Sequence, residues 1–149
     1  MSDPKELYQQ VILEHNKKPR NFGKLEPCSH HAHGLNPLCG DDIELTLVVE
    51  NDRITDIKFS GHGCAISQAS SSLMTVNVKG KSVAEAEIIA AQFREMIRGD
   101  LDPSKDQNAL GKLSLFQGVK DLPSRVKCAV LPWATLQSAV KGEVITSTE

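Results

Sequence analysis

A change of hydrophobic period near residue 62 constrains the fold of this chain more than any other feature. Apolar and polar residues alternate along residues 42–49, and Ile57 and Phe59 continue the alternation in a second run, a period of two that is typical of half-buried strands. Asn51 and Asp52 lie between the two runs and favour a turn, so the segment predicts an antiparallel hairpin. Ile54 is out of phase with the rest of the second run, which indicates a β-bulge at that point.

Beyond the hairpin, the apolar residues recur at helical spacing. One helix is expected to end near Gly80, and a second is expected to begin with a capping box of Ser82 and Glu85 and to end at Gly99. The predicted apolar faces are Ile66, Ala69, Leu73 and Val76 in the first helix, and Ala86, Ile89, Ala90, Phe93 and Ile97 in the second.

A helix is also predicted at each end of the chain. Asp3, Pro4 and Glu6 carry the capping pattern of a helix start, and Pro19 disfavours helical geometry before it, so the first helix is predicted over 3–17. The apolar face of the last helix is predicted to hold Trp133, Leu136 and Val140.

The remaining segments are predicted to be a short strand near 29–33, a mobile polar loop over 100–108 and a short helix within 110–119. This order of elements predicts an α+β fold, in which helices pack on one face of a small antiparallel sheet.

Composition and charge limit the classes of function. The chain has 149 residues, which predicts a single domain over 1–149, and its net charge is −2, which argues against a nucleic-acid partner. Aromatic residues make up 4% of the chain, which argues against a base-stacking surface. No apolar run exceeds about four residues, so no membrane span is expected. The first six residues lack the apolar core of a signal peptide, which favours the cytoplasm.

In a cytoplasmic protein, cysteines are more often metal ligands or reactive thiols than disulfide partners. Three of the four cysteines are expected at the boundaries of elements: Cys39 in a turn before the hairpin, Cys64 at a helix start, and Cys128 near the start of the last helix. A helix N-terminus lowers the pKa of a thiol and favours the thiolate.

Asp41 lies two residues after Cys39 and can reach the same centre. Three thiolates and one carboxylate make a four-coordinate set that zinc accepts. The carboxylate would be the weaker ligand, and the one that exchanges most easily. No Cys-x-x-Cys pair supports this hypothesis, and cysteines are also common core residues. The spacing therefore leaves both a shared metal site and plain burial open.

Three segments together resemble a known family. Asn36–Asp41, Gly61–Ser67 and Arg125–Ala129 are similar, in this order, to motifs of the U-type iron–sulfur assembly proteins, the group of IscU, SufU and the N-terminal domain of NifU. The N-terminal stretch from Leu7 to Asn21 is similar as well, so the resemblance covers about residues 5 to 141. It implies the SufE/IscU-like fold.

Within this family the chain most resembles the SufU branch. A segment around 100–119 is similar to the SufU insertion, and Lys127 stands where the IscU branch has a histidine. Residues 122–127 differ from the Leu-Pro-Pro-Val-Lys signature that the IscU chaperone reads. Pro132 is a further difference. Because proline donates no N–H to the residue four positions earlier, the last helix is expected either to begin after Cys128 or to be kinked.

The resemblance implies a ligand set for zinc of Cys39, Asp41, Cys64 and Cys128. In the IscU branch the same positions hold iron as a nascent [2Fe–2S] cluster, which makes the protein a scaffold. The SufU branch implies a zinc-dependent sulfurtransferase, a persulfide carrier rather than a conventional turnover enzyme.

The implied sulfur donor is a PLP-dependent, SufS-like cysteine desulfurase, and the implied recipient is a downstream cluster scaffold. Cys39 would accept the sulfur after a desulfurase histidine takes its place on zinc. Arg125 would balance the negative charge of the site, and Lys127 and His62 are further candidates for a place around it.

Other hypotheses remain. His30, His31 and His33 form a second candidate metal segment, in which His31 and His33 would share one face of a strand. A Cys–His hydrolase would use Cys64, but no orienting residue is evident. A purely structural zinc module is the third alternative, and it predicts that metal removal unfolds the chain.

Overall fold

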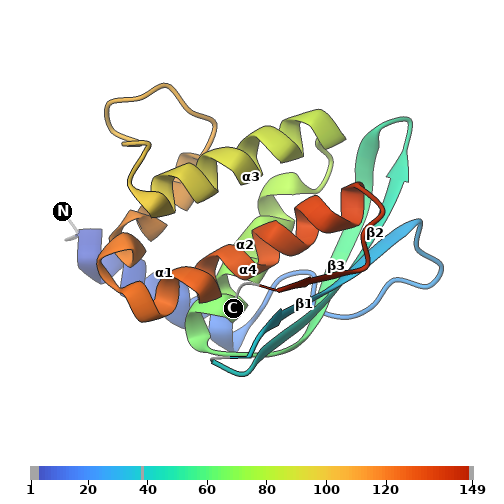
Figure 1. Cartoon of the computed structure of the whole chain (residues 1–149), viewed down its shortest axis with the longest axis horizontal. Coiled ribbons are helices and arrows are strands. Elements are labelled where there is room, and N and C mark those ends of the chain that lie inside the picture. Colours follow the sequence, from blue (N-terminus) through green and yellow to red (C-terminus); the bar gives the residue numbers. More distant parts are fainter. Residues whose placement is uncertain (1–3, 38, 148–149) are drawn as a thin grey trace.

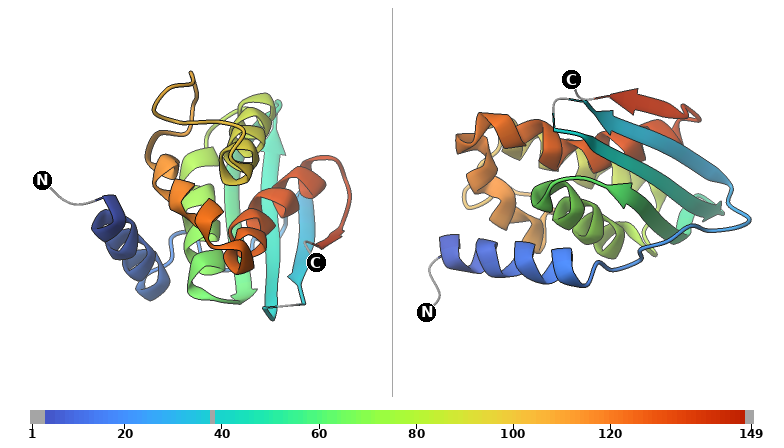
Figure 2. Two further views of the ribbon diagram at one scale, coloured as in Figure 1. Left: turned by 60° about the vertical axis from the view of Figure 1, so that its left-hand side comes forward. Right: turned by 90° about the horizontal axis from the view of Figure 1, so that it is seen from below.

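The computed structural model describes residues 4–37 and 39–147, which form an α+β fold. The elements in chain order are α1 (Pro4–Lys17), β1 (His30–Asn36), β2 (Asp41–Glu50), β3 (Arg53–His62), α2 (Ala65–Val78), α3 (Val83–Arg98), the 3-10 helix η1 (Gly111–Asp121), α4 (Pro123–Val140) and β4 (Ile145–Ser147). The helices cover one face of the sheet (Figures 1 and 2), so the predicted fold class is confirmed. Asp3, the predicted cap of the first helix, lies outside the described residues.

The strand order of the sheet is β3-β2-β1-β4. β1 and β3 each pair with β2 in antiparallel fashion, whereas β4 runs parallel to β1. β4 was not expected from the sequence, because its three residues are too few to show a period. Its pairing brings the C-terminal part of the chain beside the strand that leads toward Cys39, as the right-hand view of Figure 2 shows.

The predicted hairpin is confirmed, with Asn51 and Asp52 at its turn. Both residues have a positive φ, 53° and 60°, which suits the right-handed twist of the strands that they join. The pairing register shifts between Val48 and Val49, where Asp56 and Ile54 are the successive partners. This bulge explains why Ile54 is out of phase in the sequence but fully buried in the fold.

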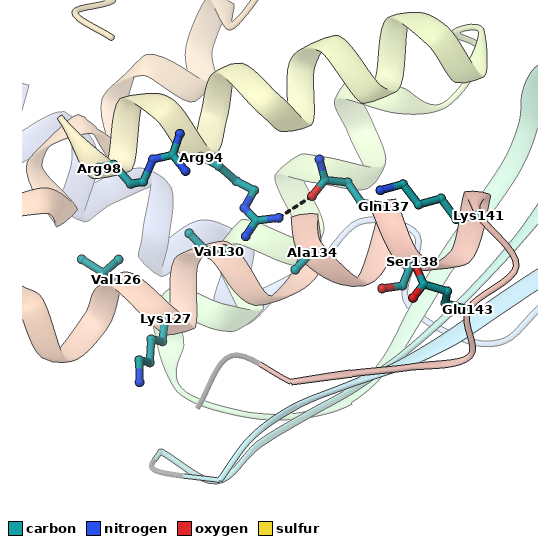
Figure 3. Close-up of a pocket in the computed structure, with 10 residues that line it drawn as sticks. All are labelled: Arg94, Arg98, Val126, Lys127, Val130, Ala134, Gln137, Ser138, Lys141 and Glu143. Atoms are coloured by element: carbon teal, nitrogen blue, oxygen red, sulfur yellow. Dashed lines mark hydrogen bonds between the residues drawn. The ribbon is translucent and has the colours of Figure 1, made fainter. Parts of the chain in front are cut away.

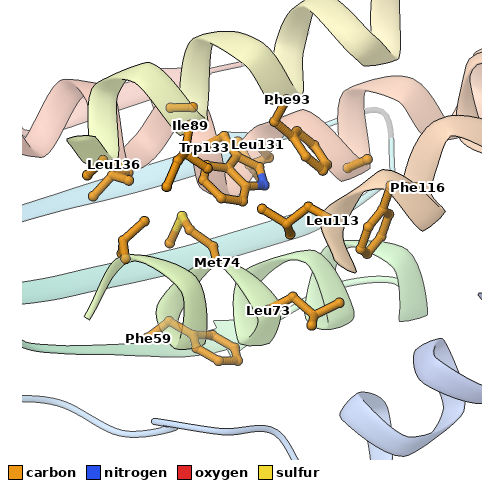
Figure 4. Close-up of a cluster of buried hydrophobic side chains, with 14 of the residues drawn as sticks. Phe59, Leu73, Met74, Ile89, Phe93, Leu113, Phe116, Leu131, Trp133 and Leu136 are labelled. Carbon is orange, nitrogen blue, oxygen red and sulfur yellow. The ribbon is translucent and has the colours of Figure 1, made fainter. Parts of the chain in front are cut away.

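The core forms where α2, α3, α4 and η1 meet the sheet (Figure 4). The capping box of Ser82 and Glu85 is present, and Gly99 ends α3 with a φ of 88°. All five residues of the predicted α3 face are buried. In α2 the prediction of Val76 was wrong, since its side chain is 49% exposed.

The α2 helix departs from a simple apolar stripe because other elements surround most of it. Met74 and Val78 are buried there, and so are several small polar residues. Ser70 Oγ donates a hydrogen bond of 2.7 Å to the carbonyl oxygen of Ala129 in α4. A single apolar stripe cannot describe a helix that packs on α1, α4 and β3 at once.

α4 corrects two expectations about the last helix. It runs from Pro123 through the buried Pro132 to Val140, so the first of the two alternatives, a helix that begins after Cys128, was wrong. Cys128 lies in the second turn of α4 rather than at its start. The packing of α4 against β1, α2 and α3 outweighs the hydrogen bond that Pro132 cannot make.

The segment between α3 and α4 contains a polar loop and then η1. Within the loop, the carboxylate of Asp102 accepts hydrogen bonds from the backbone and the hydroxyl of Ser104. The mobility expected for this loop stays a prediction. Among the described residues, no helix has the length and apolar character needed to cross a membrane.

Candidate metal centre

Two cysteines and one aspartate meet at the end of the sheet. The ligand atoms of Cys39, Asp41 and Cys128 all lie within 4.8 Å of one another, and no other group of this kind occurs in the part of the chain that the structure describes. Cys39 comes from the β1–β2 turn, Asp41 from the first position of β2, and Cys128 from α4. Three segments that are distant in sequence therefore supply one cluster.

The turn between β1 and β2 presents Cys39 to this cluster. Its backbone N–H donates to the carbonyl oxygen of Asn36 at 3.2 Å, and Gly40 follows with a φ of 72°. Cys39 is partly exposed, whereas Asp41 and Cys128 are buried. The thiols of Cys39 and Cys128 both lie near the carbonyl oxygen of Ser124, at 3.8 and 4.0 Å.

Cys64 is the N-cap of α2, at the helix start where the sequence predicted it. Its sulfur accepts a hydrogen bond from the backbone N–H of Ser67 at 3.4 Å. Its own N–H donates to Asp41 Oδ1 at 2.8 Å, which ties the helix start to the carboxylate of the cluster. The sulfur lies outside the compact group of three, but near enough to Cys128 to raise the pKa of its thiol.

The pKa of the Cys128 thiol is raised, which corrects the expectation of a thiol activated by a helix terminus. Burial is the largest cause, and the neighbouring side chains of Asp41, Cys39 and Cys64 add to it. Because Cys128 lies in the second turn of α4, the N-terminal end of the helix does not compensate for this burial. A cation is what would favour the thiolate here.

Arg125 lies beside the thiols, one helical turn before Cys128. Its guanidinium is exposed to solvent, and a hydrogen bond with Cys128 and the nearby Cys64 raise its pKa. Its role in balancing negative charge at the cluster stays a prediction.

Asn36 belongs to this centre, although no role was predicted for it from the sequence. It is fully buried, and its Nδ2 donates to Asp41 Oδ2 at 3.2 Å and to Cys128 Sγ at 3.5 Å. Its Oδ1 is buried without a hydrogen-bond partner. The available signal was its place at the start of the Asn36–Asp41 motif.

Gly63 is a second residue whose importance the sequence did not reveal. A Cβ atom at this position would lie 2.6 Å from Asp41 Oδ1 and 3.2 Å from Ser67 Oγ. That hydroxyl is itself buried without a partner. Only glycine lets the chain pass this close to the carboxylate.

The other candidate residues lie around the centre or away from it. His62 is exposed at the end of β3, and Lys127 is exposed on α4 directly before Cys128. On β1, His33 pairs with Asp42, and the Nδ1 of His30 lies 2.9 Å from Ser29 Oγ. His31 is exposed, and the described structure assembles no cluster of three metal-capable side chains from these histidines.

The donor set of the cluster fits zinc. Tetrahedral zinc holds sulfur at about 2.3 Å and carboxylate oxygen at about 2.0–2.2 Å, which places its ligand atoms roughly 3.5–3.8 Å apart. The ligand atoms of Cys39, Asp41 and Cys128 lie within 4.8 Å of one another, so small shifts of the side chains bring them to this separation. Cys64 borders the group and offers a further sulfur. Thiolate-rich sets with one oxygen also suit iron.

The fold and this centre define an α+β domain that gathers thiols and a carboxylate at one end of its sheet. The family model described as NifU-like N terminal domain matches residues 7–141. The chain belongs to this family.

Comparison with individual proteins gives two kinds of relative. The chain is 44% identical to the iron–sulfur cluster assembly scaffold protein IscU of Streptococcus pyogenes, over 91% of this chain and 83% of that protein. It is also 44% identical to the zinc-dependent sulfurtransferase SufU of Bacillus subtilis, over 92% of this chain and 91% of that protein. The structure of FiSufU from Fervidobacterium islandicum AW-1 is similar, with a TM-score of 0.83 and 39% identity over 88% of this chain and 94% of that one.

Proposed function

We propose that this protein acts in iron–sulfur cluster biogenesis as a zinc-dependent sulfur acceptor, with Cys39 as the accepting residue. The observation that carries the proposal is the unequal exposure of the cluster: Cys39 is partly exposed on a turn, while Asp41 and Cys128 are buried behind it. A partner can therefore reach Cys39 without opening the core. The similarity to SufU of Bacillus subtilis supports the same proposal.

The proposed transfer step exchanges one sulfur–sulfur bond for another. The Cys39 thiolate attacks the terminal sulfur of a persulfide on a cysteine desulfurase. A new bond forms between Cys39 Sγ and that sulfur, the old bond breaks, and the desulfurase cysteine leaves as a thiolate. Cys39 then carries the persulfide, and no further oxidant or reductant is consumed.

The proposed zinc ligands are Cys39, Asp41, Cys64 and Cys128. Zinc, when bound, holds its thiol ligands deprotonated and so supplies a thiolate at neutral pH. The contacts of this chain give each residue a separate task. Asn36 and the Cys64 N–H hold the two oxygens of Asp41, while the turn leaves Cys39 accessible.

The proposed sulfur donor is a PLP-dependent cysteine desulfurase of the SufS type in the cytoplasm, and the proposed recipient is a separate cluster scaffold. Arg125 is exposed beside the thiols and would offset part of the negative charge that the ligands leave on the site.

The second candidate function is that of a scaffold on which a [2Fe–2S] cluster assembles. The equal identity to IscU of Streptococcus pyogenes favours it, and the same thiols and carboxylate would bind iron. The two functions differ in whether the cluster forms on this chain or on the recipient.

The test uses zinc-loaded protein and a purified cysteine desulfurase, with alanine release from cysteine as the signal under a weak reductant. We expect strong stimulation that disappears in Cys39→Ala. The matched control is Cys28→Ala, which removes a partly exposed thiol outside the cluster and should leave the stimulation unchanged. Absence of stimulation, with a cluster formed on supply of iron, would favour the scaffold instead.

A further inference from the structure

A second surface of the molecule has no part in the proposed sulfur transfer. It is a groove of about 390 Å³ between α3 and α4, and none of the clustered ligands lines it. Ten residues form the groove: Arg94, Arg98, Val126, Lys127, Val130, Ala134, Gln137, Ser138, Lys141 and Glu143. Figure 3 shows these side chains along the two helices and on the segment that follows α4.

The charge of the groove is opposite to that of the whole chain. Four of its lining residues are cationic and one, Glu143, is acidic, whereas the chain as a whole has a net charge of −2. A concentration of positive charge on an acidic protein attracts an anionic partner to this surface in particular.

The floor of the groove is apolar. Val126, Val130 and Ala134 follow one another at intervals of four residues on α4, and the same face of the helix therefore presents all three. Arg94 bridges the two walls, because its guanidinium donates to Gln137 Oε1 at 2.6 Å. Arg98 lies one turn further along α3 and is exposed, with Asp100 as its surface partner.

The length of the groove distinguishes between small anions and acidic peptides as ligands. Lys127 and Lys141 are fourteen positions apart, which corresponds to about 21 Å along a helix axis. A phosphate or a small carboxylic acid cannot contact both lysines at once. A peptide segment can, since about six extended residues or four helical turns cover this distance.

We propose that the α3–α4 groove binds an acidic, amphipathic segment of a partner protein. Its apolar side chains would lie on Val126, Val130 and Ala134, and its carboxylates would pair with Arg98 and Lys141 at the two ends. A nucleic acid is the less favoured occupant, because the apolar floor offers nothing to a phosphate backbone and Glu143 repels it.

The groove and the metal centre lie on different sides of the same helix. Lys127 lines the groove, while the next residue, Cys128, faces the buried cluster. A segment bound in the groove would therefore hold its protein beside the centre and leave Cys39 open. This surface suits a partner that stays bound while sulfur is delivered to Cys39.

The experiment measures binding of a fluorescein-labelled, 16-residue designed peptide with leucine and glutamate at helical spacing. A second peptide has glutamine in place of every glutamate. Binding to the zinc-loaded protein is measured by fluorescence anisotropy. The glutamine peptide should bind at least about tenfold more weakly, because it lacks the carboxylates that pair with the cations of the groove.

Variants of the protein locate the binding. Arg98→Glu with Lys141→Glu reverses two exposed cations of the groove and should weaken binding of the glutamate peptide at least about tenfold. Lys17→Glu with Lys112→Glu makes the same change of net charge at exposed positions outside the groove. This control should alter the affinity less than about twofold. Unchanged melting temperatures will show that both variants fold.

Three results would overturn the proposal: equal binding of the two peptides, equal weakening by the two double variants, or displacement of the peptide by an oligonucleotide at lower concentration. The peptide should also bind Cys39→Ala as well as it binds the wild type. A failure of sulfur transfer and a failure of the groove proposal are therefore separate results.

Discussion

Two regions of the molecule carry side chains of the types that can bind metals, and the fold arranges them in opposite ways. At one end of the sheet, Cys39, Asp41 and Cys128 converge from three elements, and two of them are buried. On β1, three histidines lie within four residues of one another, yet they are exposed or partly exposed and form no group of three in the described structure.

The comparison shows that convergence and burial, rather than closeness in sequence, bring metal-capable side chains into one group. Asp41 in the buried region is held by Asn36 and by the N–H of Cys64. Such contacts fix a ligand before the metal arrives, so less ordering is needed on binding. On the strand, His33 instead pairs with Asp42 on a surface open to water, which gives a weak and local interaction.

The largest effect is expected from removal of a buried ligand. Cys128→Ala should reduce zinc affinity by more than the roughly 10–100-fold expected from loss of an outer hydrogen-bond partner. It should also reduce the stability gained from added zinc, because metal bound to the folded state stabilises it. Zinc content after dialysis and thermal unfolding with and without zinc measure the two effects. Retention of wild-type affinity would remove Cys128 from the site.

A smaller effect is expected at Asn36, which touches the ligands. Asn36→Ala removes the donor to Asp41 and Cys128, and it should lower zinc affinity about 10–100-fold. The matched control is Asn77→Ala, whose amide donates only to the Leu73 carbonyl within α2. Competition with a zinc chelator gives both affinities, and equal values would show that Asn36 does not position the ligands.

These residues also show how far a sequence can predict the centre. The hairpin, its bulge and the capping box of α3 depend on neighbours within a few positions, so their patterns were readable. The burial of Asn36 is different, because it depends on packing against α4. Cys128, the residue of α4 that Asn36 contacts, lies 92 positions later in the sequence. The exposure of Val76 and the continuity of α4 through Pro132 likewise depend on tertiary packing.

A buried histidine extends the contrast with the exposed strand. His15 is 8% exposed, and its Nδ1 lies 2.7 Å from Ser72 Oγ in α2. Burial is the main cause that lowers its pKa, and the charge of Arg20 adds to it. The unfolded chain therefore takes up this proton first as the pH falls. The contribution of neutral, buried His15 to the free energy of unfolding is therefore complete above pH 6.5, the ordinary pKa of histidine. It is lost as the pH decreases below this value.

His15→Gln should therefore reduce the difference between the unfolding free energies at pH 7.5 and pH 5.5, measured by urea denaturation. His33→Gln is the control on the exposed strand and should leave that difference close to the wild-type value. An equal change in both variants would mean that burial does not distinguish the two histidines.

The smallest effect is expected from the strand that looks richest in metal ligands. The triple variant His30→Ala, His31→Ala and His33→Ala should bind zinc at the centre with wild-type affinity and accept sulfur at the wild-type rate. None of the three side chains joins the group of Cys39, Asp41 and Cys128, and the Asp42 pair of His33 is a surface contact worth about 0–1 kcal/mol. Chelator competition and the alanine-release assay would both detect a role. A loss of either activity would give the exposed histidines a function that their geometry does not indicate.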